Sequence, residues 1–232
     1  MLEKALLGLE FDHLVVAADT LERGITHVER CLGVPCTPGG HHPKLGTHNA
    51  LLGLGHDRYI EVIAIDPDAD TPATPRWFGL DDPDIRATLR ERPRLLTWVA
   101  RGDDLDAAVA ACLHDTGRPR PMQRDDLHWR IAFPDDGALV EHGLVPPLIE
   151  WGEGVRHPAR RLPDAGLRLR ALHGVHPDPA RVRERLEVVV GDFERWCPES
   201  RNCLASDRFE YVAGFDEFCP ALVGVEVGQE PM

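Results

Sequence analysis

The feature that most constrains the fold is a succession of elements that occurs twice along the chain: strand, helix, loop, strand, strand. In the first copy, residues 11–18 (FDHLVVAA) are apolar and β-branched and too few for a helix, which predicts a buried strand. From Leu21 to Leu32, apolar residues recur at spacings of four, three and four, which places them on one face of a helix. Gly33 is suited to end that helix.

The second copy keeps the same spacing. Residues 95–100 (LLTWVA) predict another strand, and the helix that follows is expected to end at Gly117. Thr97 precedes Gly117 by twenty residues, as His13 precedes Gly33. The equal spacing makes Thr97 the counterpart of His13 in the second copy.

Each copy closes with two further strands, predicted over residues 47–54 and 59–65 in the first and over 128–133 and 147–151 in the second. The Gly-rich segment 38–46 is expected to be a polar loop, with a short edge strand before it as the alternative. The sequence therefore predicts an α+β fold of tandem βαβββ units. Their sheets join side by side into a curved, cup-like mixed sheet whose inward residues face a ligand.

We divide the chain into three parts. The first βαβββ unit is expected over residues 1–75, the second over 76–154, and a C-terminal extension over 155–232. In the extension, Leu and Arg alternate from residue 167, which predicts a half-exposed strand, and Asp178 begins a helix. These elements look like the start of a third, incomplete unit that covers a sheet edge or builds a dimer contact.

Charge and hydropathy limit the partners of the chain. Asp and Glu total 39 against 26 Lys and Arg, a formal net charge of −13, which disfavours nucleic acid and anionic membranes because both need clustered cations. No apolar run approaches the ~18 residues of a membrane span. The N-terminus lacks the apolar core of a signal peptide. We therefore expect a cytoplasmic protein that binds neither nucleic acid nor membrane.

Several segments carry a resemblance to a known family. They look like a glyoxalase-like domain of the vicinal oxygen chelate superfamily, which includes glyoxalase I, extradiol dioxygenases, epimerases and antibiotic-resistance proteins. The resemblance covers roughly residues 8–190 and implies the fold more firmly than the reaction, since one fold hosts many chemistries. The segments that carry it are Leu9–Ala17 (LEFDHLVVA), Gly46–Leu52 (GTHNALL), Arg58–Ala64 (RYIEVIA), Pro75–Leu80 (PRWFGL) and Leu127–Arg130 (LHWR).

The resemblance implies a metal site at inward positions of the first and last strands of each unit. These positions hold His13 and Glu61 in the first unit, and Thr97 and Glu150 in the second. One imidazole and two carboxylates suit Zn, Ni, Mn or Fe, with open positions for substrate oxygens, and Glu61 or Glu150 would move the proton. Thr97 departs from the family pattern because a neutral hydroxyl is a poor ligand, so three protein ligands or no metal remain as alternatives.

Burial adds an argument for both carboxylates. Glu61 and Glu150 stand inside apolar strands, where an unpartnered carboxylate costs several kcal/mol, so each is expected to face the cup. His48 and His128 occupy equivalent positions in the two units and could bind the ligand or supply the missing nitrogen. Asn49 should point to the face opposite to His48, by the two-residue period of a strand.

Three hypotheses about function follow. The first is a divalent-metal-dependent lyase or isomerase that acts on a small oxygenated metabolite. The second is a metal-free protein that binds and sequesters a small molecule. The third is a structural or regulatory homodimer whose cup is vestigial, which a cup filled by aromatic side chains would support. Dimers are the commonest assembly, so a homodimer is expected in each case.

Overall fold

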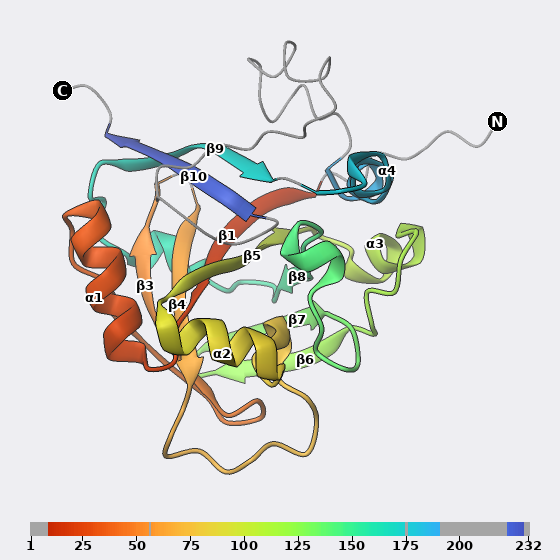
Figure 1. Ribbon diagram of the computed structural model, residues 1–232. Coiled ribbons are helices and arrows are strands. Elements are labelled where there is room, and N and C mark those ends of the chain that lie inside the picture. Colours follow the sequence, from red (N-terminus) through yellow and green to blue (C-terminus); the bar gives the residue numbers. More distant parts are fainter. Residues whose placement is uncertain (1–8, 56, 175, 191–221, 230–232) are drawn as a thin grey trace.

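The computed structural model describes residues 9–55, 57–174, 176–190 and 222–229 (Figure 1). The strands are β1 (Glu10–Ala17), β2 (Thr37–His42), β3 (Thr47–Gly53), β4 (Tyr59–Ile65), β5 (Arg94–Arg101), β6 (Arg120–Arg124), β7 (Leu127–Ala132), β8 (Leu148–Trp151), β9 (Leu167–Gly174) and β10 (Leu222–Gln229). The α-helices are α1 (Leu21–Leu32), α2 (Pro83–Glu91), α3 (Leu105–Ala111) and α4 (Pro179–Val190). Short 3-10 helices are η1 (Trp77–Gly79), η2 (Val140–Gly143) and η3 (Pro158–Arg161).

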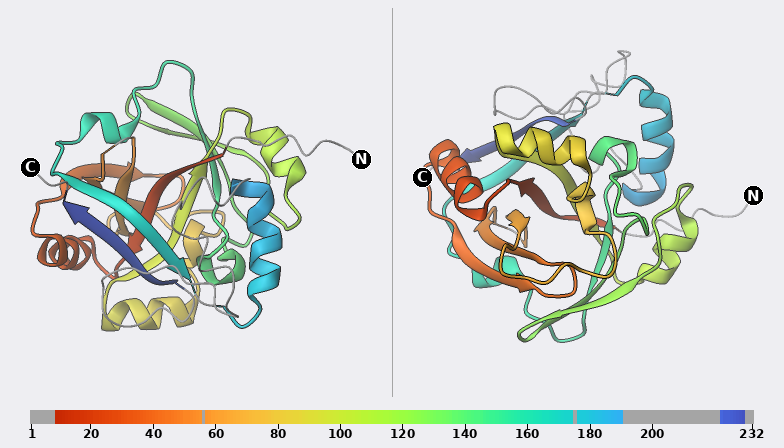
Figure 2. Two further views of the ribbon diagram at one scale, coloured as in Figure 1. Left: turned by 90° about the horizontal axis from the view of Figure 1, so that it is seen from above. Right: turned by 60° about the horizontal axis from the view of Figure 1, so that its bottom comes forward.

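One sheet contains eight of these strands, in the order β2-β3-β4-β1-β5-β8-β7-β6. At its centre β1 and β5 run antiparallel, and each pairs in parallel with the last strand of its own unit, β4 or β8. The two halves are therefore arranged alike on either side of the β1–β5 pair, and the sheet curves strongly (Figure 2). The prediction of tandem βαβββ units that form a cup-like mixed sheet is confirmed.

The two edges of the sheet approach each other and are bridged by Arg124. Its guanidinium, on β6, donates to Asn49 Oδ1 on β3 at 2.8 Å and lies 3.3 Å from His42 Nε2 on β2. Gly40 permits this approach, because a Cβ at that position would lie 2.7 Å from the Arg124 side chain. The sheet is therefore nearly closed, and its edge strands contribute side chains to the interior.

Each face of the sheet has its own apolar core. The outer cluster packs α1, α3, α4 and β9 against the sheet. The inner cluster fills one end of the cup and includes Trp77 and Phe78 from η1 and Leu89 from α2. The connection between the two units thus occupies part of the cup and confines any cavity to the remainder.

The position of α1 depends on its two ends and on one glycine. Thr20 Oγ1 caps the first turn, and Gly33 ends the helix with a φ of 72°, as the sequence predicts. Gly24 faces β4, where a Cβ would lie only 2.6 Å from Val62 Cγ1. The missing side chain lets α1 lie against the strand that carries Glu61.

The structure differs from the sequence prediction in its edge strands and in one helix end. β2 occupies a segment expected to be mostly loop, and β6 lies where the sequence gives no strand signal, because Pro and Gly obscure the alternation in these edge strands. α3 ends at Ala111 rather than Gly117. Gly117 instead packs against Phe133, whose carbonyl oxygen would lie 1.9 Å from an added Cβ.

The C-terminal extension begins with the predicted strand and helix, here β9 and α4. β9 pairs with β10 in a separate two-stranded sheet, which lies over the eight-stranded sheet in Figures 1 and 2. Residues 191–221 of the extension lie outside the described residues. The boundaries at residues 75 and 154 stay a prediction.

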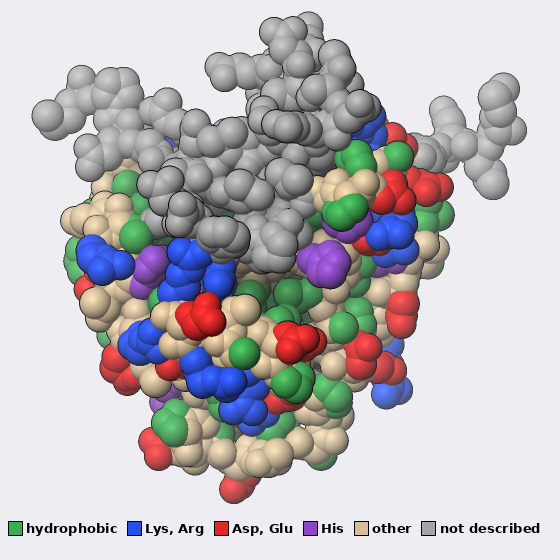
Figure 3. Space-filling view, in the orientation of Figure 1, with side chains coloured by type: hydrophobic (Ala, Val, Ile, Leu, Met, Phe, Trp, Pro, Cys, Tyr) green, Lys and Arg blue, Asp and Glu red, His purple; other side chains and the backbone are tan. Residues whose placement is uncertain are grey.

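Two surface features bear on the partners of the chain. None of the helices in the described ranges is long and apolar enough to cross a membrane. On the face drawn in Figure 3, Lys and Arg side chains gather on the lower half, with Asp and Glu side chains among them. That face therefore carries charges of both signs.

The close contact of α1 with β4 yields a test of the fold. Gly24→Val should lower the free energy of unfolding by about 2 kcal/mol, because the new side chain overpacks against Val62. Thr26→Val places the same side chain at an exposed position of the same helix and should change stability by about 0.5 kcal/mol or less. Urea unfolding measures both, and equal effects would contradict the packing.

Candidate functional site

The candidate site is a small cavity at the end of the cup that η1 and α2 leave open. Its empty volume is about 400 Å³ including its mouth, of which the centres of water molecules could occupy about 30 Å³. A ligand larger than a few water molecules must therefore move side chains on entry. The cavity is lined by His13, His42, Asn49, Leu51, Tyr59, Glu61, Trp77, Phe78, Arg124, Trp129, Ile131, Ile149, Trp151 and Pro158.

Asp12, His13 and Glu61 form a line of buried charges at this cavity, which we call the charged row. Asp12 Oδ1 lies 2.6 Å from His13 Nδ1, and His13 Nε2 lies 3.6 Å from Glu61 Oε2. The exposed fractions of the three residues are 0%, 4% and 6%. Ionisable groups this deeply buried are costly unless they are paired, and here each is paired with the next.

The strand pairing explains how the charged row forms. β1 and β4 are parallel, with His13 opposite Tyr59 and Val15 opposite Glu61, so His13 and Glu61 lie on the same face of neighbouring strands. A register shift between Phe11 and His13 leaves Asp12 out of the pairing with β5. Such a bulge re-aims a side chain, and here it lets Asp12 bond to the residue that follows it.

Asp12 is held from three further sides. Trp151 Nε1 donates to its Oδ2 at 3.0 Å, His157 Nε2 lies 2.9 Å from the same oxygen, and Arg101 lies 3.6 Å away. Burial alone would raise the pKa of Asp12, but hydrogen bonds with His13 and His157 outweigh burial and hold this pKa well below its ordinary value. Asp12 is therefore a carboxylate at every pH at which the protein is expected to work.

The same balance sets the charges of the other two members of the row. Burial alone would lower the pKa of His13, but its contacts with Asp12 and Glu61 raise it from 6.5 to about 9. Burial alone would raise the pKa of Glu61, but the neighbouring His13 lowers it from 4.5 to about 2. At neutral pH the row is an imidazolium between two carboxylates.

The other side of Glu61 is held by an amide. Asn49 Nδ2 donates to Glu61 Oε1 at 2.5 Å, and the Oδ1 atom of Asn49 accepts from Gly40 N at 2.9 Å and from Arg124. These contacts connect Glu61 to both edge strands of the sheet. The seam that closes the cup therefore also fixes the orientation of the Glu61 carboxylate.

His42 completes the polar part of the wall as a neutral imidazole. Its Nδ1 lies 3.1 Å from Thr47 Oγ1, and burial lowers its pKa from 6.5 to about 4. The cavity therefore has one histidine that is charged at neutral pH and one that is not.

Aromatic rings make the rest of the wall. The Tyr59 ring stacks on His13 with centroids 4.5 Å apart, and Trp77 lies edge-on to His42 at 4.9 Å. Trp77 Nε1 is buried and has no hydrogen-bond partner among the described residues. A buried indole N–H normally has an acceptor, so a ligand oxygen or a water in the cavity would satisfy it.

Glu150 does not join the charged row, contrary to the sequence prediction. Its carboxylate accepts from Arg130 at 2.8 Å and from the Leu105 backbone N–H, at the start of α3, also at 2.8 Å. On β8 it is Ile149 and Trp151 that line the cavity, so the alternation of the strand turns Glu150 to the outer face. The buried context of Glu150 is satisfied by an arginine and a helix start rather than by a ligand.

Thr97 and His128 are also placed away from the cavity. The Thr97 hydroxyl is buried and donates to the Gly143 carbonyl at 2.9 Å. His128 is exposed on β7, between Leu127 and Trp129, which both point into the inner core. The structure therefore brings neither residue to His13 and Glu61.

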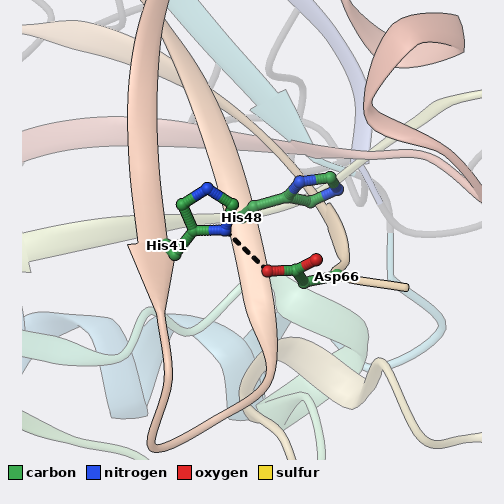
Figure 4. A group of neighbouring side chains, drawn as sticks. All are labelled: His41, His48 and Asp66. Atoms are coloured by element: carbon green, nitrogen blue, oxygen red, sulfur yellow. Dashed lines mark hydrogen bonds and ion pairs between the residues drawn. The ribbon is translucent and has the colours of Figure 1, made fainter. Parts of the chain in front are cut away.

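His48 lies on the face of β3 opposite to Asn49, as the alternation predicts. It is Asn49 that lines the cavity, while His48 stands near His41 and Asp66 (Figure 4). The segment that resembles the family thus contributes to the cavity through the residue after the one singled out in the sequence.

The donor set of the cavity does not fit the four-residue metal site that the resemblance implies. His13 and Glu61 could act as ligands, but Thr97 is bonded to a backbone carbonyl and Glu150 is turned outward. The β8 residues in the cavity, Ile149 and Trp151, have no ligand atom of the kind that Zn²⁺ or Fe²⁺ prefers. The second unit therefore adds no ligand to the pair from the first unit.

Sequence reasoning did not single out several residues of the site. Asp12 and Asn49 each stand beside a residue that was singled out, and only the bulge and the strand alternation show which neighbour faces the cavity. Arg124, His42 and His157 come from an edge strand, a Gly-rich segment and a 3-10 turn, where periodicity gives no signal. Polar residues next to the resembling segments were the one signal available.

The fold and the cavity together define a cup-forming protein with a buried polar site between tandem βαβββ units. Residues 11–190 match the family described as Glyoxalase-like domain. The chain belongs to this family, and with it to the vicinal oxygen chelate superfamily. A search of curated proteins finds no match.

Solved structures share the fold at low sequence identity. A hypothetical protein from Staphylococcus aureus is 16% identical, with a TM-score of 0.54, over 78% of this chain and 75% of that one. Methylmalonyl-CoA epimerase from Mycobacterium tuberculosis is 22% identical, with a TM-score of 0.38, over 65% and 92%. The Streptomyces coelicolor epimerase in complex with 2-nitronate-propionyl-CoA is 17% identical, with a TM-score of 0.39, over 64% and 98%.

The charged row predicts a large effect of neutralising its buried end. Asp12→Asn should lower the free energy of unfolding by about 3 kcal/mol, because it leaves the His13 imidazolium with one carboxylate fewer in a buried site. Glu10→Gln removes an exposed carboxylate from the same strand and should cost about 0.5 kcal/mol or less. Chemical unfolding of both variants at neutral pH tests the difference, and a loss no larger for Asp12→Asn would contradict the pairing.

His42 predicts a pH dependence of stability. In the unfolded chain His42 binds a proton below pH 6.5, but in the folded chain only below about pH 4. Its contribution to stability is therefore complete above pH 6.5 and is lost as the pH falls through this window. His42→Gln should flatten the loss between pH 6.5 and pH 5, by about 2 kcal/mol at pH 5. Unfolding curves that keep the same slope in the variant would show that His42 is not buried neutral.

Proposed function

We propose that this chain is an isomerase or lyase that binds a small oxygenated metabolite in the cup and transfers a proton between ligand and protein. The observation that carries the proposal is the buried His13–Glu61 pair at the wall of the cavity. An acid and a base that face one space at a distance of 3.6 Å are suited to act on adjacent atoms of one ligand.

The charges of the pair assign a role to each residue. Glu61 is ionised and would accept a proton from a carbon next to a carbonyl or hydroxyl group. His13 is protonated and would donate a hydrogen bond from Nε2 to the ligand oxygen on which negative charge then develops. Return of the proton to the other face or to the neighbouring carbon completes an isomerisation.

Other groups at the cavity support this orientation. Asp12 holds the His13 ring through Nδ1, so Nε2 is the nitrogen left to face the ligand. Asn49 holds one oxygen of Glu61, which leaves Oε2 as the base. The unpartnered N–H of Trp77 would donate to a second ligand oxygen, and the aromatic wall would exclude water from the reaction.

The metal-dependent form of this proposal, with Zn, Ni, Mn or Fe, would rest on His13 and Glu61 alone. A bound metal would polarise the ligand oxygen and so supply the chemistry assigned above to the His13 proton. Proton transfer by Glu61 is the same in both forms. Metal content of untagged, chelator-free protein, compared with Glu61→Gln, distinguishes them.

A metal-free binding protein that sequesters its ligand is the second candidate. The low pKa of Glu61 favours it, because a carboxylate with a pKa of about 2 is a weak base. The vestigial-cup hypothesis fits the aromatic filling at one end of the cup. It does not explain why buried charges persist at the other end, where apolar side chains would be less costly.

Solvent-proton exchange tests the catalytic proposal. Small hydroxy-carbonyl compounds and vicinal diols are screened first for binding to the wild-type chain, and the bound compounds are then incubated with protein in D₂O. Wild type should introduce deuterium next to the ligand carbonyl, and Glu61→Gln should slow this exchange by about 100-fold or more.

Binding measurements on the same variants separate the two candidates. Glu61→Gln should retain ligand affinity within roughly threefold if Glu61 acts only in proton transfer. His128→Gln, at an exposed position outside the cavity, should leave both exchange and affinity unchanged. Ligand binding without exchange in wild type would favour the sequestering protein, and absence of binding to the whole panel would contradict both candidates.

We also propose that the chain acts as a cytoplasmic homodimer with no nucleic-acid or membrane partner. The acidic composition supports the absence of these partners, and the prevalence of two-fold dimers supports the assembly. Light scattering of the purified chain should give twice the mass of 25.8 kDa.

A further inference from the structure

We propose that His41, His48 and Asp66 form a binding site for a divalent transition-metal ion outside the cup (Figure 4). This site is separate from the charged row and does not depend on the proposed reaction. Each residue offers one ligand atom, and the three atoms all lie within 4.8 Å of one another.

The strand pairing brings these residues together. His41 on β2 is directly opposite His48 on β3 in the antiparallel register. Asp66 follows β4, whose last residue, Ile65, pairs with Thr47 next to His48, and the Asp66 backbone N–H donates to the Gly46 carbonyl. Three neighbouring strands thus place two imidazoles and a carboxylate at one point, on a rigid part of the fold.

The distances suit a metal ion after a small adjustment. His41 Nδ1 and Asp66 Oδ2 are now 2.6 Å apart, as a hydrogen-bonded pair. Ligand atoms about 2.0–2.1 Å from a tetrahedral ion lie about 3.3 Å from one another, so this pair would separate slightly and His48 would move inward. The His41 side chain is 68% exposed and is free to adjust.

His48 carries the observation that points to an absent ligand. Its Nε2 atom is buried and has no hydrogen-bond partner among the described residues. Buried polar atoms in folded proteins are almost always satisfied, and an imidazole nitrogen left over beside another imidazole and a carboxylate is a ready metal ligand. The ion would give this nitrogen its partner.

The donor set also defines the class of ion. Two imidazole nitrogens and one carboxylate oxygen suit Zn²⁺ or Fe²⁺ and leave coordination positions for water. The Asp68 backbone N–H donates to Asp66 Oδ1 at 3.0 Å, which holds the carboxylate in place and leaves Oδ2 for the ion. These contacts support a site that is already oriented for binding.

The location suggests what the ion would do. In β2 and β3, the residues next to the two ligands are His42 and Asn49, and both line the cavity on the other face. An ion that joins His41 to His48 would therefore clamp the hairpin whose inner side positions the Glu61 carboxylate. The structure assigns to this metal site a stabilising role at the edge of the cup.

Calorimetric titration with ZnCl₂ tests the site. The full chain, freed of metal by chelator, should bind one Zn²⁺ ion with an affinity that falls at least tenfold in His48→Gln and in Asp66→Asn. His128→Gln is the matched control, because it removes an exposed histidine elsewhere, and it should bind as wild type does. His13→Gln should also retain this binding, which separates the site from the cup.

A second measurement covers the case of a variant that fails to fold. Co²⁺ added to wild type should give visible absorption bands that His48→Gln and Asp66→Asn lack while circular dichroism shows both variants folded. Wild type that binds no Zn²⁺ and gives no Co²⁺ bands would overturn the proposal. So would binding that is lost in His13→Gln but kept in His48→Gln.

Discussion

The site and much of the fold around it depend on the pairing of charges in the Asp12–His13–Glu61 row. Each of these groups would be costly to bury alone, and together they place an imidazolium between two carboxylates. This arrangement requires the β1–β4 register that brings His13 and Glu61 to one face, and the bulge that turns Asp12 towards His13. Gly24 serves the same end from outside, because it lets α1 press against the strand that carries Glu61.

The order of elements could be predicted from the sequence because their signals are local. The apolar runs, the helical spacing from Leu21 to Leu32 and the stop at Gly33 each depend on near neighbours. The same kind of argument succeeded for Glu61 and failed for Glu150, although both stand in apolar strands. β8 is buried on both faces, so its sequence does not show which face a residue takes, and Arg130 together with the start of α3 provides the partner that the strand itself does not reveal.

The rest of the site depends on long-range geometry. Arg124 reaches Asn49 only because the sheet closes until its edge strands meet, and this closure depends on the curvature of all eight strands. The same closure links the two proposed sites, since one hairpin presents His41 and His48 outward and His42 and Asn49 inward. Neighbouring residues with opposite roles are a consequence of the two-residue period of a strand. A small shift of this hairpin would therefore be felt in both places.

The ionisation of His13 is the most direct test of this account. Nuclear magnetic resonance of the nitrogen-15-labelled, chelator-treated chain reports the protonation of the His13 ring as a function of pH. The account predicts an imidazolium at pH 7 that loses its proton only near its raised pKa of about 9. A His13 ring that is neutral at pH 7 would contradict the charged row and, with it, the division of roles between His13 and Glu61.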